Sequence, residues 1–180
     1  VMLMQENRSF DHSFGTLKGV RGFNDRRPIQ LVNGNPVWLQ SNKKGQTFAP
    51  FRLDIKNSKA SWTRDLPHSW ENQIGAWNGG HFDKWLDWKQ SGRKEYNGLP
   101  LTLGYYTRED IPFYYAFADA FTICDQHFCS SITGTTTNRH YFWTGKCAAN
   151  SNSKPLTRNS DTYYNKMVNW KTFPERLQEN

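Results

Sequence analysis

The chain has no apolar run near the roughly 18 to 20 residues that a membrane-spanning helix needs, so the sequence predicts no transmembrane segment. It also has no internal repeat and no low-complexity tract. These residues include no signal peptide, and any such peptide would lie in a segment that precedes them. Within these bounds, the 180 residues are enough for one domain with a real core.

Long runs of one charge are missing as well. Lysine and arginine number 23 against 16 acidic residues, a net charge of +7, yet no run of basic residues exceeds two. A nucleic-acid-binding tract is therefore not indicated, and we expect no nucleic-acid partner. The dispersed positive charge fits phosphate esters or an anionic lipid surface instead.

Cysteine is scarce, with Cys124, Cys129 and Cys147 as the three examples and no metal-type C-x-x-C spacing among them. One disulfide with a spare thiol and three buried thiols both remain open. Cysteine content therefore does not indicate a redox compartment.

Aromatic residues, by contrast, are abundant at 16% of the chain. The sequence begins with Val1 inside a predicted strand and ends at Asn180, where a helix has just begun. We interpret residues 1–180 as a fragment of a longer protein, truncated at both ends.

The opening of the chain combines an apolar run with polar, chemically capable side chains. Val1–Met4 is predicted to be a short buried strand, and Glu6 and Asn7 follow at its carboxyl end. Ligands bind at that end of the strands in open α/β sheets. A carboxylate beside a carboxamide offers two hard oxygen ligands, which suit Mg²⁺, Ca²⁺ or Mn²⁺ and are tolerated by Zn²⁺. The alternative is an ordinary polar turn.

A second polar cluster lies more than a hundred residues later, in residues 133–140, and runs into an aromatic stretch that ends at Gly145. This order predicts a loop that enters a helix N-terminus, where free backbone N–H groups attract an anion. A threonine there is placed to bind phosphate or to become an alkoxide. The alternative is a simple helix cap, because threonine caps helices routinely.

Other local patterns predict the elements around these clusters. We expect helices over residues 8–17, 75–90 and 110–120, and a final helix opened by the capping box of residues 172–175. We also expect a hairpin turn at Asn33-Gly34 before an edge strand at 36–39, and a strand at 121–124. Asp110 is predicted to cap the third of these segments, and residues 113–120 are predicted to be well buried. Asp11 and His12 are interpreted as solvated or as lying behind a site, and His68 taken alone as structural.

The two clusters together resemble a known family. ENRSFDH followed by FGTLKGVRGF resembles the opening of the bacterial phosphatidylcholine-type phospholipases C, a phosphoesterase family that includes acid phosphatases. DLPHSW, GYYTREDIPFYYAFADAFTICD, TGTTTNR, WTG and TFPERL are similar to its further blocks, in order. The resemblance covers most of the chain and implies an α/β fold, an αβα sandwich resembling alkaline phosphatase that is incomplete in this fragment. Residues 1–180 would be the N-terminal part of one phosphoesterase catalytic domain.

The resemblance also implies roles for individual residues. Glu6 and Asn7 match metal ligands, and Thr135 matches a hydroxyl nucleophile that also contacts the metal. His68 matches a histidine near the phosphate, so the structural interpretation of this residue is reversed. Asn138 and Arg139 match the pair that follows the nucleophile and binds substrate.

One departure concerns the register of the nucleophile. The family commonly has a proline before the Asn-Arg pair, and this chain has Thr137. Because three threonines are consecutive, Thr136 is the alternative nucleophile. The remaining metal ligands of the family lie beyond the residues present here.

The function implied is that of a phospholipase C, which cleaves a phosphatidylcholine-type phospholipid at a membrane surface to diacylglycerol and phosphocholine. One or more divalent metal ions of unknown identity would be the cofactor, and family members are usually exported. The alternatives are an acid phosphatase on the same scaffold and a non-catalytic module that binds lipid or polysaccharide.

Overall fold

The computed structural model describes residues 1–63, 65–163 and 168–180 and divides the chain into two compact units. The first unit contains Val1–Pro67 and Gly75–His127, and the second contains His68–Ile74 and Phe128–Asn180. Helix α2 (Trp70–Trp77) contributes residues to both units. The interpretation of residues 1–180 as part of one catalytic domain stays a prediction.

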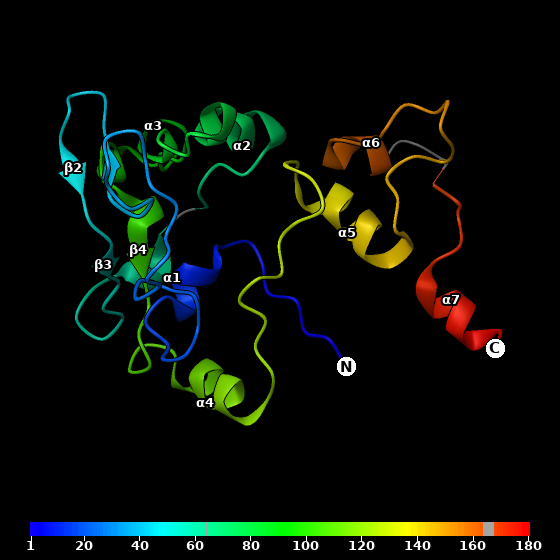
Figure 1. Ribbon diagram of the computed structural model, residues 1–180, viewed down its shortest axis with the longest axis horizontal. Helices are drawn as coiled ribbons and strands as arrows, with labels where there is room; N and C mark the ends of the chain where they lie inside the picture. The colour runs from blue at the N-terminus through cyan, green and yellow to red at the C-terminus, as the bar shows by residue number, and fades with distance from the viewer. Residues whose placement is uncertain (64, 164–167) are drawn as a thin grey trace. The chain divides into compact units, whose positions relative to one another are not determined.

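The first unit combines short helices with short strands, as Figure 1 shows. Its α-helices are α1 (Phe10–Phe14), α3 (Trp85–Trp88) and α4 (Pro112–Ala120). Its 3-10 helices are η1 (Ala60–Trp62), η2 (Asn78–Gly80), η3 (Lys94–Tyr96) and η4 (Leu101–Leu103). Strands β1 (Gln40–Ser41) and β2 (Thr47–Phe48) pair antiparallel, with Gln40 opposite Phe48, whereas β3 (Phe51–Arg52) and β4 (Gly104–Tyr105) pair in parallel, with Phe51 opposite Gly104.

Helix α1 is held against strand β4 by hydrogen bonds. The Nδ1 of His12 lies 2.7 Å from the carbonyl oxygen of Gly104, and the backbone N–H of Tyr106 donates to the carbonyl oxygen of His12 at 2.8 Å. A Cβ atom at Gly104 would lie 2.9 Å from the Leu53 side chain, so glycine lets Leu53 pack directly on this strand. Helix α1 is therefore anchored to the parallel strand pair.

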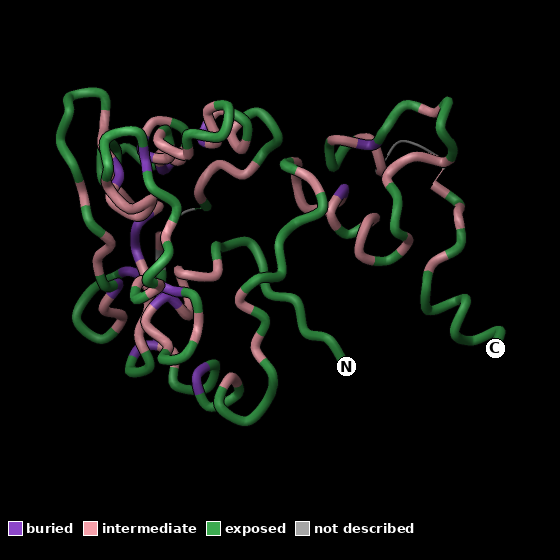
Figure 2. Tube along the Cα trace, in the orientation of Figure 1, coloured by how far each residue is buried: buried purple, intermediate pink, exposed green. Residues whose placement is uncertain are grey.

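Buried apolar residues are concentrated in the first unit (Figure 2). They are Leu31, Leu53, Ala60, Ala76, Leu86, Leu103 and Tyr115. In the described part of the second unit, the buried residues are Leu156 and Thr137. The second unit therefore has a much smaller core.

The second unit contains the remaining helices, α5 (Thr135–Thr144), α6 (Asn159–Tyr163) and α7 (Phe173–Gln178). The predicted capping box is confirmed, because Glu175 accepts hydrogen bonds from the backbone N–H and the hydroxyl of Thr172. Helix α5 also follows its prediction, with Gly134 before it and Gly145 in the left-handed conformation at φ 74° after it. These local signals were sufficient because each acts within one helical turn.

Two predictions near the start of the chain have opposite outcomes. The helix is confirmed in shorter form as α1, which ends at Gly15. The buried strand at Val1–Met4 is wrong, because these residues are exposed and form no strand. A strand is stabilised by its neighbours, and none of the described strands pairs with this segment.

The hairpin turn at Asn33-Gly34 is confirmed, with Gly34 at φ 82°. The edge strand at 36–39 is wrong: only Pro36 makes a bridge, with Gln30. Proline lacks the N–H that a continuing ladder would use.

The helix expected over residues 75–90 is interrupted. Helix α2 ends at Trp77, and Asn78, Gly79, Gly80 and Phe82 all adopt positive φ before α3 begins at Trp85. The backbone N–H of Phe82 donates to the carbonyl oxygen of Trp77 at 2.9 Å, which terminates α2. The conformation of Gly79 and Gly80 therefore interrupts the helix, although the spacing of the aromatic residues predicts that it continues.

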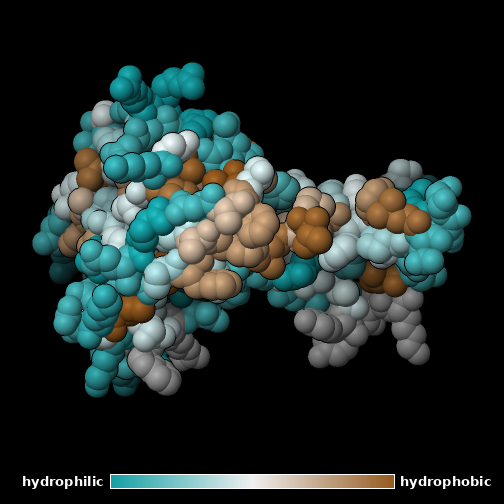
Figure 3. Space-filling model, turned by 90° about the horizontal axis from the view of Figure 1, so that it is seen from below, coloured by the Kyte–Doolittle hydropathy of each residue, from teal (hydrophilic) through white to brown (hydrophobic). Residues whose placement is uncertain are grey.

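Helix α4 departs from its prediction in two ways. Asp110 does not cap it, because Ile111 is the N-cap and Pro112 is the first helical residue. Its aromatic residues are largely exposed, with Tyr115 the buried exception, and Figure 3 shows hydrophobic surface where this helix faces the viewer. The expected strand at 121–124 is also absent from the structure. Apolar composition alone did not reveal whether a packing partner lies over these residues.

All three cysteines are free thiols, so neither of the arrangements left open by the sequence occurs: no disulfide forms, and none of the three is buried. The described residues establish a mixture of helices and short strands, with one parallel pair. The specific αβα sandwich stays a prediction.

Candidate functional site

Glu6 and Asn7 lie in the exposed segment that leads into α1, in the first unit. Their carboxylate and carboxamide oxygens are donors that suit a hard divalent cation. Within the described ranges, no group of three or more His, Cys, Asp or Glu side chains is arranged to hold a metal ion. The donor type therefore fits a divalent metal, but these side chains supply only part of a coordination shell.

Asp11 and His12 are half-buried on α1. Burial raises the pKa of Asp11 to about 6, and its Oδ1 is buried without a hydrogen-bond partner among the described residues. Burial lowers the pKa of His12, the hydrogen bond to Gly104 opposes that shift, and the nearby Arg8 guanidinium lowers it further. Neither side chain is freely solvated, so that interpretation is wrong, and the alternative that both lie behind a site stays a prediction.

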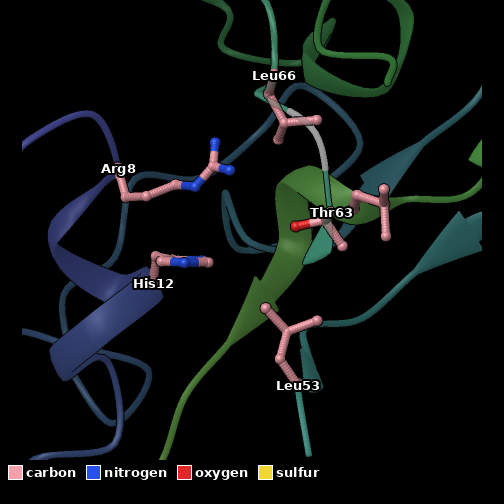
Figure 4. A pocket seen from close by; sticks show the side chains of 6 residues that line it. Arg8, His12, Leu53, Thr63 and Leu66 are labelled. Atoms are coloured by element: carbon pink, nitrogen blue, oxygen red, sulfur yellow. The ribbon is translucent and has the colours of Figure 1, made fainter. Parts of the chain in front are cut away.

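His12 also lines a cleft that the sequence did not indicate. Figure 4 shows Arg8, His12, Leu53, Thr63 and Leu66 around it, and Leu101 completes the lining. These residues come from four separate stretches of the first unit. No local pattern predicts the cleft, because tertiary packing alone brings those stretches together.

In the second unit, helix α5 presents Thr135 as its first residue, directly after the extended Gly134. The next residue, Thr136, has its backbone N–H bonded to the side-chain oxygen of Asn159 at 3.1 Å. One of the N–H groups predicted to attract an anion is therefore already used. Sequence analysis missed Asn159 because it lies 23 positions away with no linking motif.

The three consecutive threonines have different environments. Thr137 is 2% exposed, and its hydroxyl donates to the carbonyl oxygen of Leu156 at 2.8 Å. Thr135 and Thr136 are only half-buried. Thr137 is therefore committed to the small core of the unit, which leaves Thr135 and Thr136 as candidates for a nucleophile.

Asn138 holds the loop that precedes α5. Its Nδ2 donates to the carbonyl oxygens of Ser131 and Gly134, each at 3.1 Å, and its Oδ1 accepts from the N–H of Ser131 at 3.1 Å. Arg139 is exposed on the same helix. The contacts of Asn138 fix the position of Gly134 and hence the start of α5, whereas substrate binding by Asn138 and Arg139 stays a prediction.

His68 is half-buried in the irregular segment that precedes α2, within the second unit. It therefore belongs to the same unit as Thr135, Asn138 and Arg139. Glu6 and Asn7 belong to the other unit. The structure thus places the predicted site residues in two groups, one in each unit.

The described residues include no helix long and apolar enough to cross a membrane. A family model described as "Phosphoesterase family" matches residues 1–180.

Among curated proteins, the chain is 43% identical over 181 residues to a non-hemolytic phospholipase C of Burkholderia pseudomallei, covering 99% of this chain and 24% of that protein. It is 41% identical over 182 residues to a hemolytic phospholipase C of Pseudomonas aeruginosa, covering 98% of this chain and 23% of the relative. It is 40% identical over 184 residues to phospholipase C A of Mycobacterium tuberculosis, covering 99% of this chain and 35% of the relative. The chain therefore spans about a quarter to a third of the length of these relatives.

Proposed function

This chain belongs to the Phosphoesterase family, and on that premise we propose that its natural protein is a phospholipase C. The observation that carries the proposal is the match of nearly the whole chain, at 40 to 43% identity, to proteins named phospholipase C. Relatives named hemolytic and non-hemolytic match almost equally, at 41% and 43%. Identity over this segment therefore supports the phospholipase activity that these relatives share. It does not indicate whether the natural protein is hemolytic.

The substrate proposed is a phosphatidylcholine-type phospholipid, and the nucleophile is the hydroxyl of Thr135. Its position at the start of α5 favours negative charge on oxygen, because the N-terminus of a helix carries partial positive charge. Glu6, Asn7 and Thr135 would hold a divalent metal ion with further ligands from outside these residues. When bound, such an ion lowers the pKa of a hydroxyl and neutralises phosphate charge.

The reaction proceeds in two displacements. The Thr135 oxygen attacks phosphorus as its proton leaves, the bond from phosphorus to the diacylglycerol oxygen breaks, and diacylglycerol departs after taking up a proton. Phosphocholine stays esterified to Thr135 until water cleaves that ester and restores the hydroxyl.

The other predicted residues assist these steps. His68 is proposed to donate the proton to the leaving oxygen, a role suited to imidazole near neutral pH. Arg139 is proposed to bind a phosphate oxygen, because a guanidinium matches phosphate geometry. Asn138 supports them by holding the loop before α5 and is proposed to contact substrate from that position.

The test is turnover of a short-chain phosphatidylcholine by the protein in its full natural length. We expect Thr135→Ala to lower kcat by at least about 10³-fold, because no other group replaces the nucleophile. Thr135→Ser keeps the hydroxyl and should retain much of the rate. The matched control is Thr136→Ala, which should stay within about tenfold of wild type.

Near-normal turnover by Thr135→Ala would contradict this nucleophile, and loss of turnover in Thr136→Ala alone would move the role to Thr136. A phosphomonoester assayed beside the diester separates a phospholipase C from an acid phosphatase. Chelation should abolish turnover, whereas lipid binding without turnover or metal dependence would indicate a non-catalytic module.

A further inference from the structure

The cleft lined by Arg8 and His12 combines a positive end with apolar walls. Its lining contains an arginine, a histidine, a threonine and three leucines, but no carboxylate. The space enclosed by these residues is about 10 Å³, which is room for about one water-sized group. The cleft therefore takes one oxygen atom of a larger group, and the rest of that group would lie at its open mouth.

Arg8 differs from five other arginines of the chain in forming no ion pair with a described residue. Arg21, Arg52, Arg93, Arg108 and Arg158 each form an ion pair with a carboxylate. Arg8 forms none with any residue that the structure describes. Figure 4 shows its side chain directed into the cleft above His12. A guanidinium in this position presents unused donors to whatever enters.

His12 is oriented to supply a second donor. A carbonyl oxygen only accepts hydrogen bonds, so the Nδ1 of His12 must donate to Gly104 across their 2.7 Å separation. The ring also packs edge-on against Tyr106, with centroids 4.9 Å apart. With Nδ1 held and the ring fixed, Nε2 is the nitrogen left for the cleft, and in the protonated ring it donates.

Thr63 gives the cleft a further polar edge. Its hydroxyl makes a long hydrogen bond of 3.3 Å to the carbonyl oxygen of Ala60 and points toward the Arg8 and His12 side of the cleft in Figure 4. Leu53 and Leu66 supply apolar walls. Charge-assisted hydrogen bonds to an anion are stronger in such partly apolar surroundings.

We propose that Arg8 and His12 form an oxyanion-binding site for a phosphate group in the first unit. The group is either free phosphate or the phosphate of a lipid headgroup, since both present the same oxygens. Arg8 contacts two of its oxygens and His12 a third. The site does not depend on the identity of the nucleophile.

The test is equilibrium dialysis of radiolabelled inorganic phosphate against the full-length natural protein at about pH 5 with a chelator present. The acidic pH protonates the His12 imidazole, whose pKa is lowered by burial, and the chelator removes any contribution from metal. Arg8→Met and His12→Asn should each weaken binding about tenfold, because each removes one charge-assisted contact. The asparagine amide keeps a donor for Gly104 while removing Nε2, which protects the fold. Arg8→Lys, which keeps the charge but loses the planar fork, should fall between.

Two controls locate the site. Arg26→Met makes the same change of charge at an exposed position of the first unit and should bind phosphate within about twofold of wild type. Arg27→Met, at a second exposed position of the first unit, should likewise bind phosphate within about twofold of wild type. Competition by short-chain phosphatidic acid or by unlabelled phosphate, whichever is tighter, identifies the source of the group.

Absence of phosphate binding by the wild-type protein, or wild-type binding by both Arg8→Met and His12→Asn, would overturn the proposal. Equal weakening by Arg26→Met would also overturn it, because the effect would then be one of net charge.

Discussion

Asp110 shows how a single side chain can connect distant parts of the first unit. Its side chain is fully buried, and it accepts hydrogen bonds from the Nε of Arg52 at 2.9 Å and from the backbone N–H and hydroxyl of Thr107 at 2.9 and 2.7 Å. Burial alone would raise the pKa of this carboxyl, but the hydrogen bonds from Arg52 and Thr107 outweigh burial and hold the pKa well below its usual range. The carboxylate thereby ties β3 to the loop before α4.

We expect Asp110→Asn to lower the free energy of unfolding by about 2 kcal/mol, because the buried Arg52 contact loses its charge. The folded-state pKa is depressed, so the stabilisation is present above the unfolded pKa and is lost as pH falls through the region below about pH 4. Urea unfolding of the wild type at pH 7 and near pH 3 should show this loss, and the variant should show a smaller dependence on pH.

Glu109→Gln is the matched control for this prediction. Glu109 binds the same arginine, but its side chain is 69% exposed, so its removal should cost less than about 0.5 kcal/mol. Equal losses for the two variants would contradict the assignment of the stability to the buried carboxylate.

At the same scale, residue types identified the candidate chemistry but not its local context. Thr135, Thr136 and Thr137 are the same residue type, so sequence alone does not rank them as nucleophiles. The burial of Thr137 against Leu156 is what excludes that residue as the nucleophile. Asn159 and Arg8 drew no attention, because their roles depend on contacts with residues far away in the sequence. Glu6 and Thr135 were paired solely through resemblance to a family, since no local pattern links residues so far apart.

At the scale of elements, prediction succeeded where the signal was local. Gly15, Gly145 and the Thr172 capping box mark helix ends through backbone geometry and one-turn contacts, and α1, α5 and α7 end or begin there. It failed where stability depends on a partner, as in the strand expected at Val1–Met4. Apolar residues specify that a segment can be buried, but not what would bury it.

The contact between α2 and α3 supports a prediction at this scale. A Cβ at Gly75 would lie 2.2 Å from the indole ring of Trp88. Glycine to alanine within a helix normally stabilises by about 1 kcal/mol. Here we expect Gly75→Ala to destabilise by about 1 to 2 kcal/mol, because the indole must be displaced. Thermal unfolding followed by circular dichroism would measure the change.

The second substitution Trp88→Leu tests the reason for that loss. It removes the ring that the new methyl group meets, so Gly75→Ala should become neutral or stabilising in its presence. If Gly75→Ala costs the same in both backgrounds, Trp88 is not the cause.

At the scale of the whole molecule, apolar burial is unevenly shared between the two units. The first unit contains seven of the eight buried apolar residues that the structure describes, and Leu156 is the eighth. Composition did not predict this division, because aromatic residues occur in both halves of the sequence and many of them, such as Phe113 and Trp143, remain exposed. Only the folded arrangement shows which apolar side chains are covered.

We therefore expect amide hydrogen exchange in the 180-residue chain to be faster in α5 than in α4 and β4, since local stability follows buried apolar contact. Mass spectrometry of peptic peptides would measure it. Leu156→Ala should cost about 2 to 5 kcal/mol locally and remove the remaining protection of α5 without changing that of α4. Slower exchange in α5 than in α4 would contradict this order.

Free thiols on both sides of the boundary between the units have a practical consequence. Cys124 lies in the first unit and Cys129 lies in the second, and both are exposed. Cys147 is less accessible, and its Sγ donates to the Tyr141 hydroxyl oxygen at 3.0 Å. Maleimide dyes or nitroxide spin labels would therefore attach first to Cys124 and Cys129. The native sequence thus already provides two labelling sites for measuring distances across the segment that joins the units.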